Sequence, residues 1–213
     1  IIAGKRVIVA GYGWCSKGIA MRAKALGAKV IVTEIDPILA IEAIMDGYEV
    51  MKMEEASLVG DIFVCATGNK DVITLDHMLK MKDRAILANA GHFNVEIDIE
   101  SLEEAAIEKK ELRKNVMGYK LSNGRWICVL AEGRLVNIAA ADGHPAEIMD
   151  MSFAVQCLSA LYIKEHKGKL EKKVIDVSKE IDYQVARRLL KAWNVEIDTL
   201  SEEQREYQNS WKI

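Results

Sequence analysis

The sequence has few aromatic residues, almost no proline and no excess of charge of either sign. Aromatic side chains make up 6% of its 213 residues, and only two residues are proline, so a proline-rich linker is excluded. Half of the residues are hydrophobic, which predicts an aliphatic core and excludes wholesale disorder. The 29 Lys and Arg residues stand against 32 Asp and Glu residues, a net charge of −3. Because nucleic-acid-binding proteins gather a basic surplus, we expect no nucleic-acid partner.

Long apolar runs, a leader segment and paired cysteines are also missing. The apolar runs are short, as in Arg6–Ala10, whereas crossing a bilayer takes about 18 residues, so we expect no membrane partner. The four cysteines are dispersed without a CxxC pair, which favours a reduced, cytoplasmic protein without a metal site. They are Cys15, Cys65, Cys128 and Cys157.

The first half alternates short β-branched runs with helical stretches. The runs are apolar throughout rather than alternating, which is typical of strands covered on both faces. Strands that alternate with helices at this spacing predict a Rossmann-type, doubly wound parallel α/β sheet, and we assign it residues 1–145. The predicted strands are Arg6–Ala10, Lys29–Thr33, Asp61–Cys65, Arg84–Ala88 and Trp126–Leu130, with helices at Gly18–Leu26 and Pro37–Gly47.

The second half predicts mainly helices. Pro145 can open a long apolar helix that runs to His166, and a further helix is expected at Ile181–Trp193. We assign residues 146–213 to this connecting helix and C-terminal tail. The charged run Glu108–Glu111 is interpreted as a solvated turn, and His77 as a solvated side chain.

A glycine-rich turn follows the first strand and precedes the first helix. Gly11 and Gly13 would let the backbone approach a pyrophosphate, whose charge meets the N–H groups of the helix start. Ser16 stands where the GxGxxG fingerprint has its third glycine; it is small enough for close helix–strand packing, and its hydroxyl is a candidate phosphate contact. Glu34 ends the second strand about 20 residues later, where a carboxylate would hold the ribose hydroxyls of NAD. No arginine follows it to take a 2′-phosphate, so the sequence predicts NAD rather than NADP.

Polar residues follow the later strands as well. Asn69 lies after the third strand and is either a turn former or a ligand contact. His92 lies after the fourth strand, and the residues alone leave it open between a structural role and acid–base chemistry. His144 either caps the long helix or presents its imidazole to a ligand. Asn137 lies in the loop after the last strand.

Several strings together resemble the S-adenosylhomocysteine hydrolase (adenosylhomocysteinase) family. Other two-domain NAD dehydrogenases are expected to share the fold but not these strings. The resemblance covers a cofactor domain and a C-terminal tail, to about Trp211, in the family's order. The strings are Ala3–Lys5, Val9–Gly13, Thr33–Pro37, Asn89–Asn94, Ala131–Asn137 and Gly143–Pro145.

The resemblance implies a role for each candidate residue. The pyrophosphate would lie against Gly11, Tyr12, Gly13, Trp14, Cys15 and Ser16, and the adenosine ribose against Glu34. Thr67, Asn69, Ala90, Gly91 and His92 would line the cofactor, and Asn137 would hold the nicotinamide amide. His92 is the implied catalytic residue, near the reacting carbons, and His144 is the implied contact to the substrate's base. Ser16 departs from the family pattern, and the chain ends without the Lys/Tyr extension of longer members.

The resemblance also implies an activity. It is the hydrolysis of S-adenosylhomocysteine, or a close analogue, to adenosine and homocysteine, with tightly bound NAD and transient oxidation of the ribose 3′-hydroxyl. Members carry a substrate domain before the cofactor domain, and this sequence opens on Ile1, so we expect a fragment or half of a split enzyme, inactive alone. By resemblance the enzyme is a homo-oligomer, a tetramer. The alternative is a non-catalytic NAD-binding regulatory or interaction protein. A 2-hydroxyacid dehydrogenase would need an arginine and an acid-paired histidine that we do not find.

Overall fold

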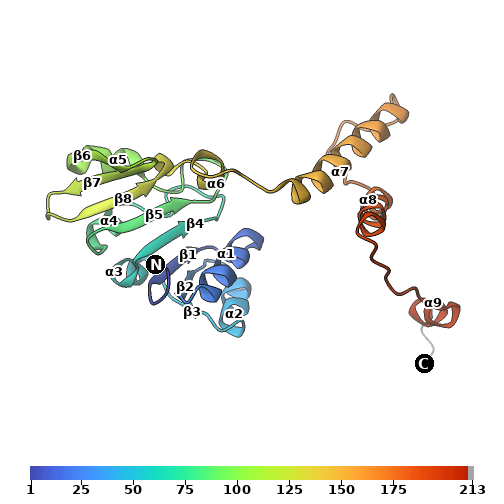
Figure 1. Cartoon of the computed structure of the whole chain (residues 1–213), viewed down its shortest axis with the longest axis horizontal. Coiled ribbons are helices and arrows are strands. Elements are labelled where there is room, and N and C mark those ends of the chain that lie inside the picture. Colours follow the sequence, from blue (N-terminus) through green and yellow to red (C-terminus); the bar gives the residue numbers. More distant parts are fainter. Residues whose placement is uncertain (211–213) are drawn as a thin grey trace. The chain divides into compact units, whose positions relative to one another are not determined.

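The computed structural model describes residues 1–210 and divides the chain into two compact units (Figure 1). They are Ile1–Gly143 and His144–Ile213, against the predicted division after residue 145. The last part of the predicted tail, Trp211–Ile213, lies outside the described residues.

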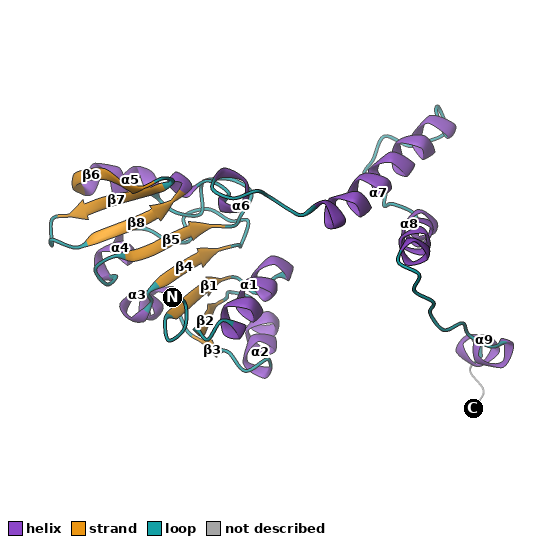
Figure 2. Cartoon of the chain, in the orientation of Figure 1, coloured by secondary structure: helices purple, strands orange, loops and turns teal. Residues whose placement is uncertain are grey.

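The first unit is an eight-stranded sheet with short helices (Figure 2). Its strand order is β3-β2-β1-β4-β5-β8-β7-β6. The strands from β3 to β8 in this order are all parallel, whereas β7 and β6 are antiparallel to their neighbours. The strands are β1 (Arg6–Ala10), β2 (Lys29–Thr33), β3 (Glu49–Val50), β4 (Ile62–Cys65), β5 (Ala85–Asn89), β6 (Ala106–Arg113), β7 (Val116–Leu121) and β8 (Trp126–Leu130). The helices are α1 (Trp14–Ala25), α2 (Pro37–Met45), α3 (Met53–Val59), α4 (Leu75–Lys80), α5 (Ile99–Ala105) and α6 (Val136–Ala139), with a 3₁₀ turn η1 at Ala131–Gly133.

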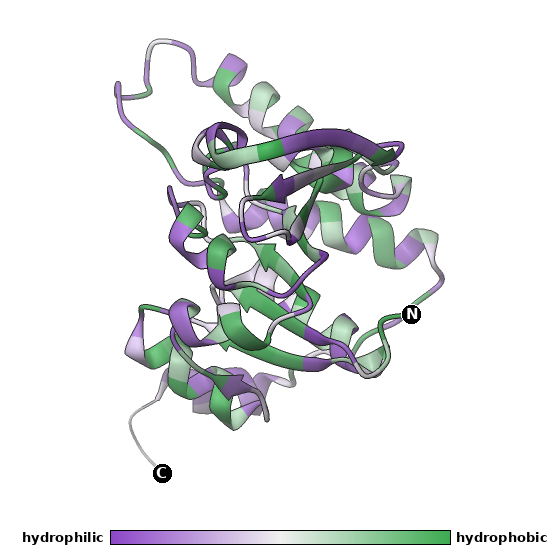
Figure 3. Cartoon of the chain, turned by 90° about the vertical axis from the view of Figure 1, so that its left-hand side faces the viewer, coloured by the Kyte–Doolittle hydropathy of each residue, from purple (hydrophilic) through white to green (hydrophobic). Residues whose placement is uncertain are grey.

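The sheet is buried on both faces, as the unbroken apolar strands predict. In β1, Ile8 and Ala10 belong to a core that includes residues of α3, α4 and α5. Val7 and Val9 point the other way, into a second core with residues of α1 and α2. Figure 3 shows the inner strands as mainly hydrophobic. The doubly wound Rossmann-type fold is therefore confirmed.

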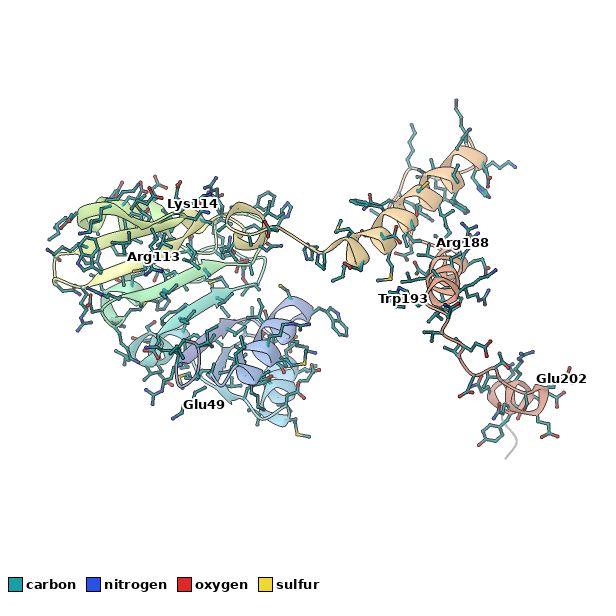
Figure 4. All side chains as sticks on the ribbon, viewed as in Figure 1. Glu49, Arg113, Lys114, Arg188, Trp193 and Glu202 are labelled. Carbon is teal, nitrogen blue, oxygen red and sulfur yellow. The ribbon has the colours of Figure 1, made fainter. Side chains whose placement is uncertain are left out.

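The antiparallel hairpin of β6 and β7 is absent from the sequence-based prediction. The charged run Glu108–Glu111 is part of the edge strand β6 and pairs with β7, so its interpretation as a turn is wrong. Lys and Glu side chains are common on exposed edge strands, where they oppose pairing with other chains. Arg113 and Lys114, labelled in Figure 4, stand at the turn of this hairpin.

The second unit is helical. It contains α7 (Ala146–Glu165), α8 (Lys179–Ala192) and α9 (Glu202–Asn209). The first two lie close to the predicted helices, whereas α9 was not predicted. No residue of α7 is buried, and its large apolar side chains Phe153 and Ile163 are 56% and 58% exposed. Among residues 1–210, α7 is the one helix long and apolar enough to cross a bilayer, with a mean hydropathy of 1.2. Helices that are covered by other protein surfaces have the same length and composition, so these two properties of α7 are weak evidence for a membrane span.

His77 is a helix cap rather than a solvated side chain, which corrects the sequence-based interpretation. Its Nδ1 accepts a hydrogen bond of 3.2 Å from the Thr74 N–H at the start of α4. Burial, reinforced by the charge of Lys80, lowers the pKa of His77. The neutral imidazole is therefore the form that the fold stabilises.

We expect a pH dependence of stability from this cap. A lowered folded-state pKa gives stability that is complete above the unfolded pKa of about 6.5 and is lost as the pH falls through the folded value. Between about pH 7 and pH 5, the unfolding midpoint should therefore drop about 1–4 °C more for the wild type than for His77→Gln. Gln accepts the same bond without titrating. Parallel thermal melts of both proteins measure this, and identical pH profiles would contradict it.

Candidate functional site

The turns at the carboxyl ends of five neighbouring strands form one continuous edge of the sheet. Hydrogen bonds link the strand ends and turns in the order β2, β1, β4, β5 and β8. Open parallel sheets bind their ligands at this edge. The four bonds are Tyr12 N to Glu34 Oε2 (2.6 Å), Ser16 Oγ to the Ala66 carbonyl (3.2 Å), Ala90 N to the Cys65 carbonyl (2.7 Å) and Asn89 Nδ2 to the Gly133 carbonyl (2.9 Å).

A pocket of about 550 Å³ opens at the β2 side of this edge. Its volume is in the range of small-molecule sites, which are mostly apolar with a few polar groups. Apolar side chains from the β2 and β3 turns form one wall, and the glycine turn forms another. The lining residues are Gly11, Tyr12, Gly13, Thr33, Glu34, Ile35, Leu39, Met51, Lys52, Met53, Ala66, Thr67, Asn69, Lys70 and Val72.

The glycine turn has the geometry that an anion needs. Gly11 has φ +88°, a conformation that side chains rarely adopt, and a Cβ there would lie 3.2 Å from Thr67 Cγ2. A Cβ on Gly13 would instead meet no atom within 4 Å, so open space lies in front of the turn. α1 begins at Trp14 with no acidic residue in its first turn. Its first N–H groups are therefore available to a pyrophosphate.

Two predicted contact residues turn their side chains inward. Tyr12 is 2% exposed, and its hydroxyl donates to Asp46 Oδ2 at 2.6 Å. The Ser16 hydroxyl is buried and donates to the Ala66 carbonyl, so the suggested hydroxyl–phosphate contact does not match the structure. Ser16 is instead buried between α1 and the strand ends, where its small side chain permits the close packing that a third glycine would allow. Trp14 and Cys15 are exposed beside the turn, Trp14 at 91%.

Glu34 is half-buried in the pocket wall and is held by backbone donors. Its Oε2 accepts from Tyr12 N, and its Oε1 accepts from Ile35 N at 2.7 Å and from Asp36 N at 3.1 Å. Asp36 in turn caps α2, accepting from Ile38 N at 2.7 Å. A carboxylate has about four acceptor positions, so Glu34 retains capacity for a ribose hydroxyl.

Replacing Glu34 should weaken NAD binding and relax the choice of cofactor. Hydrogen bonds to a charged group contribute about 1.5–3 kcal/mol, so Glu34→Ala should lower NAD affinity about tenfold or more. NADP affinity should fall less, because the carboxylate no longer repels a 2′-phosphate. Calorimetric titration of both cofactors tests this, with Glu49→Ala on the exposed edge of β3 (labelled in Figure 4) as a control. Equal affinities of the unaltered chain for NAD and NADP would contradict the assignment.

The turn after β4 is organised by a residue that the sequence-based prediction missed. Glu96 is 1% exposed, and its carboxylate accepts from Thr67 N, Thr67 Oγ1 and Gly68 N at 3.0, 2.7 and 2.9 Å. Asn69 is exposed, and its Oδ1 accepts from Lys70 N, which is a turn-forming contact. A lone acid between the apolar Val95 and Ile97 is the sequence signal for such a buried carboxylate.

The turn after β5 carries His92. Asn89 is fully buried and holds this turn: its Oδ1 accepts from Gly91 N at 2.7 Å, and its Nδ2 donates to the Phe93 carbonyl at 2.8 Å. Ala90 and Gly91 form the inner part of the turn, and His92 is exposed at its tip. Within residues 1–210 no hydrogen bond engages the His92 imidazole, which contacts the Phe93 ring at a centroid distance of 4.3 Å.

Asn137 presents an unsatisfied acceptor. It lies in α6, beyond the Gly133 carbonyl that Asn89 holds, and its Oδ1 is buried without a hydrogen-bond partner. A buried polar atom without a partner is costly, and an amide N–H of a ligand would satisfy it. His144 is exposed at the start of the second unit, before α7. Within residues 1–210 no three His, Cys, Asp or Glu side chains are placed to hold a metal ion.

Comparisons with known proteins agree with this geometry. Residues 1–143 match a family model described as "S-adenosyl-L-homocysteine hydrolase, NAD binding domain". The chain is 57% identical over 212 residues to an adenosylhomocysteinase from Saccharolobus solfataricus and 60% identical over 213 residues to one from Aquifex aeolicus. Each alignment covers 100% of this chain and 51% of the relative, so the chain spans about half the length of these relatives.

Among solved structures, a dipicolinate synthase from Bacillus halodurans is similar at 22% identity and a TM-score of 0.46. That similarity covers 49% of this chain and 36% of the other.

Proposed function

The chain belongs to the S-adenosyl-L-homocysteine hydrolase family, with residues 1–143 as its NAD-binding domain, and we propose that it is the cofactor-binding half of an adenosylhomocysteinase. The complete enzyme would hydrolyse S-adenosylhomocysteine to adenosine and homocysteine. The observation that carries this proposal is the match of the whole chain, at 57–60% identity, to half of proteins named for that activity.

The residues at the sheet edge fit the cofactor. The pocket of about 550 Å³ offers the Glu34 carboxylate to the adenosine ribose, and the N–H groups at the start of α1 to the pyrophosphate. The buried, unpartnered Asn137 Oδ1 fits the nicotinamide amide. When bound, NAD supplies the hydride acceptor for transient oxidation of the ribose 3′-hydroxyl. The protein's own task is to orient the cofactor and to exclude water from the oxidised sugar.

His92 is the proposed proton carrier of this half. Its imidazole is exposed at the tip of the β5 turn without a hydrogen bond from the described residues, so both ring nitrogens are free to exchange protons. Loss of the proton next to the oxidised carbon would release homocysteine from the 5′ carbon, and His92 would deliver a proton to the departing sulfur. Water would then add at that carbon, and return of the hydride would reduce the ketone to the 3′-hydroxyl of adenosine. His144 would contact the substrate's base.

We also propose a cytoplasmic homo-oligomer, a tetramer by family resemblance, without nucleic-acid or membrane partners. Support comes from the apolar side chains that α7 leaves exposed within its own unit, because such surfaces are usually covered by other protein. The unpaired cysteines support a reducing compartment, and the net charge of −3 supports the absence of a nucleic-acid partner.

A chimera tests the proposal. Residues 1–213 would be joined to the preceding half of the Aquifex aeolicus relative, and adenosine release from S-adenosylhomocysteine would be followed by chromatography. We expect turnover in the ordinary range of enzymes, about 1 s⁻¹ or more. A chimera that retains NAD but releases no adenosine would favour the non-catalytic alternative instead.

A further inference from the structure

Glu96 is a buried acid at the centre of the cofactor edge. It follows the His92 turn in the sequence, yet its side chain reaches back to the β4 turn, where it accepts hydrogen bonds from Thr67 N, Thr67 Oγ1 and Gly68 N. Thr67 also lines the pocket and lies against Gly11 of the phosphate turn. The Glu96 carboxylate therefore positions this wall of the pocket from its buried side.

The same carboxylate lies directly beneath the β5 turn. A Cβ on Gly91 would overlap Glu96 Oε1, so only glycine leaves room for the acid at this position. Gly91 N is bonded to Asn89 Oδ1 at 2.7 Å, which fixes the turn from its other side. His92 is the next residue. A shift of the Glu96 side chain toward this turn would therefore press on the backbone next to His92.

Burying this acid is costly, and the fold does not need it for hydrophobic stability. A buried charge is tolerated only with several hydrogen bonds, and an apolar residue of similar size often gives equal or greater stability. Such groups are retained in some proteins because they specify one arrangement rather than many. Here the arrangement is the placement of the two cofactor turns, which lie beyond Cys65 and Asn89, the last pair of the β4–β5 ladder.

We propose that Glu96 is a positioning residue that couples the adenosine pocket to the His92 turn. Its hydrogen bonds to Thr67 and Gly68 fix the position of the pocket wall. Its contact with Gly91 links that position to the turn that would border the nicotinamide. This inference rests on the proposed function in that NAD is the ligand. It assigns no chemical step to Glu96.

The test is the ratio of two affinities. ADP carries only the half of the cofactor that meets Glu34 and the phosphate turn, whereas NAD also requires the β5 turn. In Glu96→Gln, an amide group must replace one of the two acceptor oxygens, so we expect the NAD-to-ADP affinity ratio to fall at least about tenfold. The control is Glu103→Gln on α5, whose carboxylate accepts from Lys109 of β6 and Tyr119 of β7 and does not line the pocket. Its ratio should equal that of the wild type. General loosening of the domain would lower both affinities together and leave the ratio unchanged, which would overturn the proposal.

A milder variant covers the case in which Glu96→Gln does not fold. Thr67→Val removes one of the three bonds and should lower the ratio by a smaller factor, about threefold or more. Hydrogen exchange gives a second readout: NAD should slow amide exchange at residues 90–93 in the wild type but not in Glu96→Gln. An unchanged ratio in Thr67→Val, or equal protection of residues 90–93 in both proteins, would overturn the inference. A chimera without hydrolysis would overturn the proposed activity alone, whereas a wild-type chain that binds no NAD would overturn both.

Discussion

Replacing His92 with Asn in the complete enzyme should lower turnover about 10²–10⁴-fold, the usual contribution of a positioned acid–base group. Asn keeps a polar side chain of similar reach but neither accepts nor releases a proton near neutral pH. The backbone of the turn is held by Asn89 and not by the His92 side chain, so the fold and the NAD content should survive. Turnover and bound NAD measured on the same chimeric preparation test both halves of this expectation.

A histidine outside the site supplies the control. His77 caps α4 through Thr74, so His77→Gln should leave turnover near the wild-type value. If His92→Asn keeps full activity with normal NAD content, His92 is a cofactor-lining residue and the proton for the departing sulfur comes from elsewhere. If activity and NAD content fall together, the substitution has damaged the binding turn instead.

The sequence predicts the parallel core well because its signal is strong and local. Strands such as Lys29–Thr33 are buried on both faces, so nearly every residue is apolar or β-branched and the run stands out from the amphipathic helices around it. The edge hairpin gives no such signal. In β6 most side chains are exposed, and the run Glu108–Glu111 has the composition of a turn. Its strand state depends on pairing with β7, which composition does not encode.

The residues of the candidate site also differ in how well the sequence predicts them. The glycine turn and Glu34 are recognisable because their spacing follows from local backbone geometry. Asn89 and Glu96 are not, since each acts through contacts between turns that are distant in the sequence, such as Glu96 with Thr67. A sequence motif also does not predict where the Ser16 side chain points, because its hydroxyl bonds to the carbonyl of Ala66, which follows another strand.

The 213-residue chain alone should release adenosine from S-adenosylhomocysteine at least about 10³-fold more slowly than the chimera. The proposed chemistry needs a base for the 3′-hydroxyl, a base for the 4′ hydrogen, a proton donor for the departing sulfur and walls that exclude water. Of these we assign only the proton donor, His92, to this chain, and the absence of one positioned acid or base already lowers turnover about 10²–10⁴-fold. By resemblance, the lysine and carboxylates for the other roles belong to a substrate domain.

Exposure to solvent should lower the turnover of the lone chain further. The pocket is open, so solvent would screen interactions that a closed cleft strengthens. Adenosine should be detected by chromatography rather than homocysteine by a thiol reagent, because the exposed Cys15 and Cys157 would react with the reagent. Adding the substrate domain as a separate chain should restore turnover if the interface forms again. Turnover of about 1 s⁻¹ by the lone chain would show that residues 1–213 contain every acid and base that the reaction needs, and would refute the division of roles proposed above.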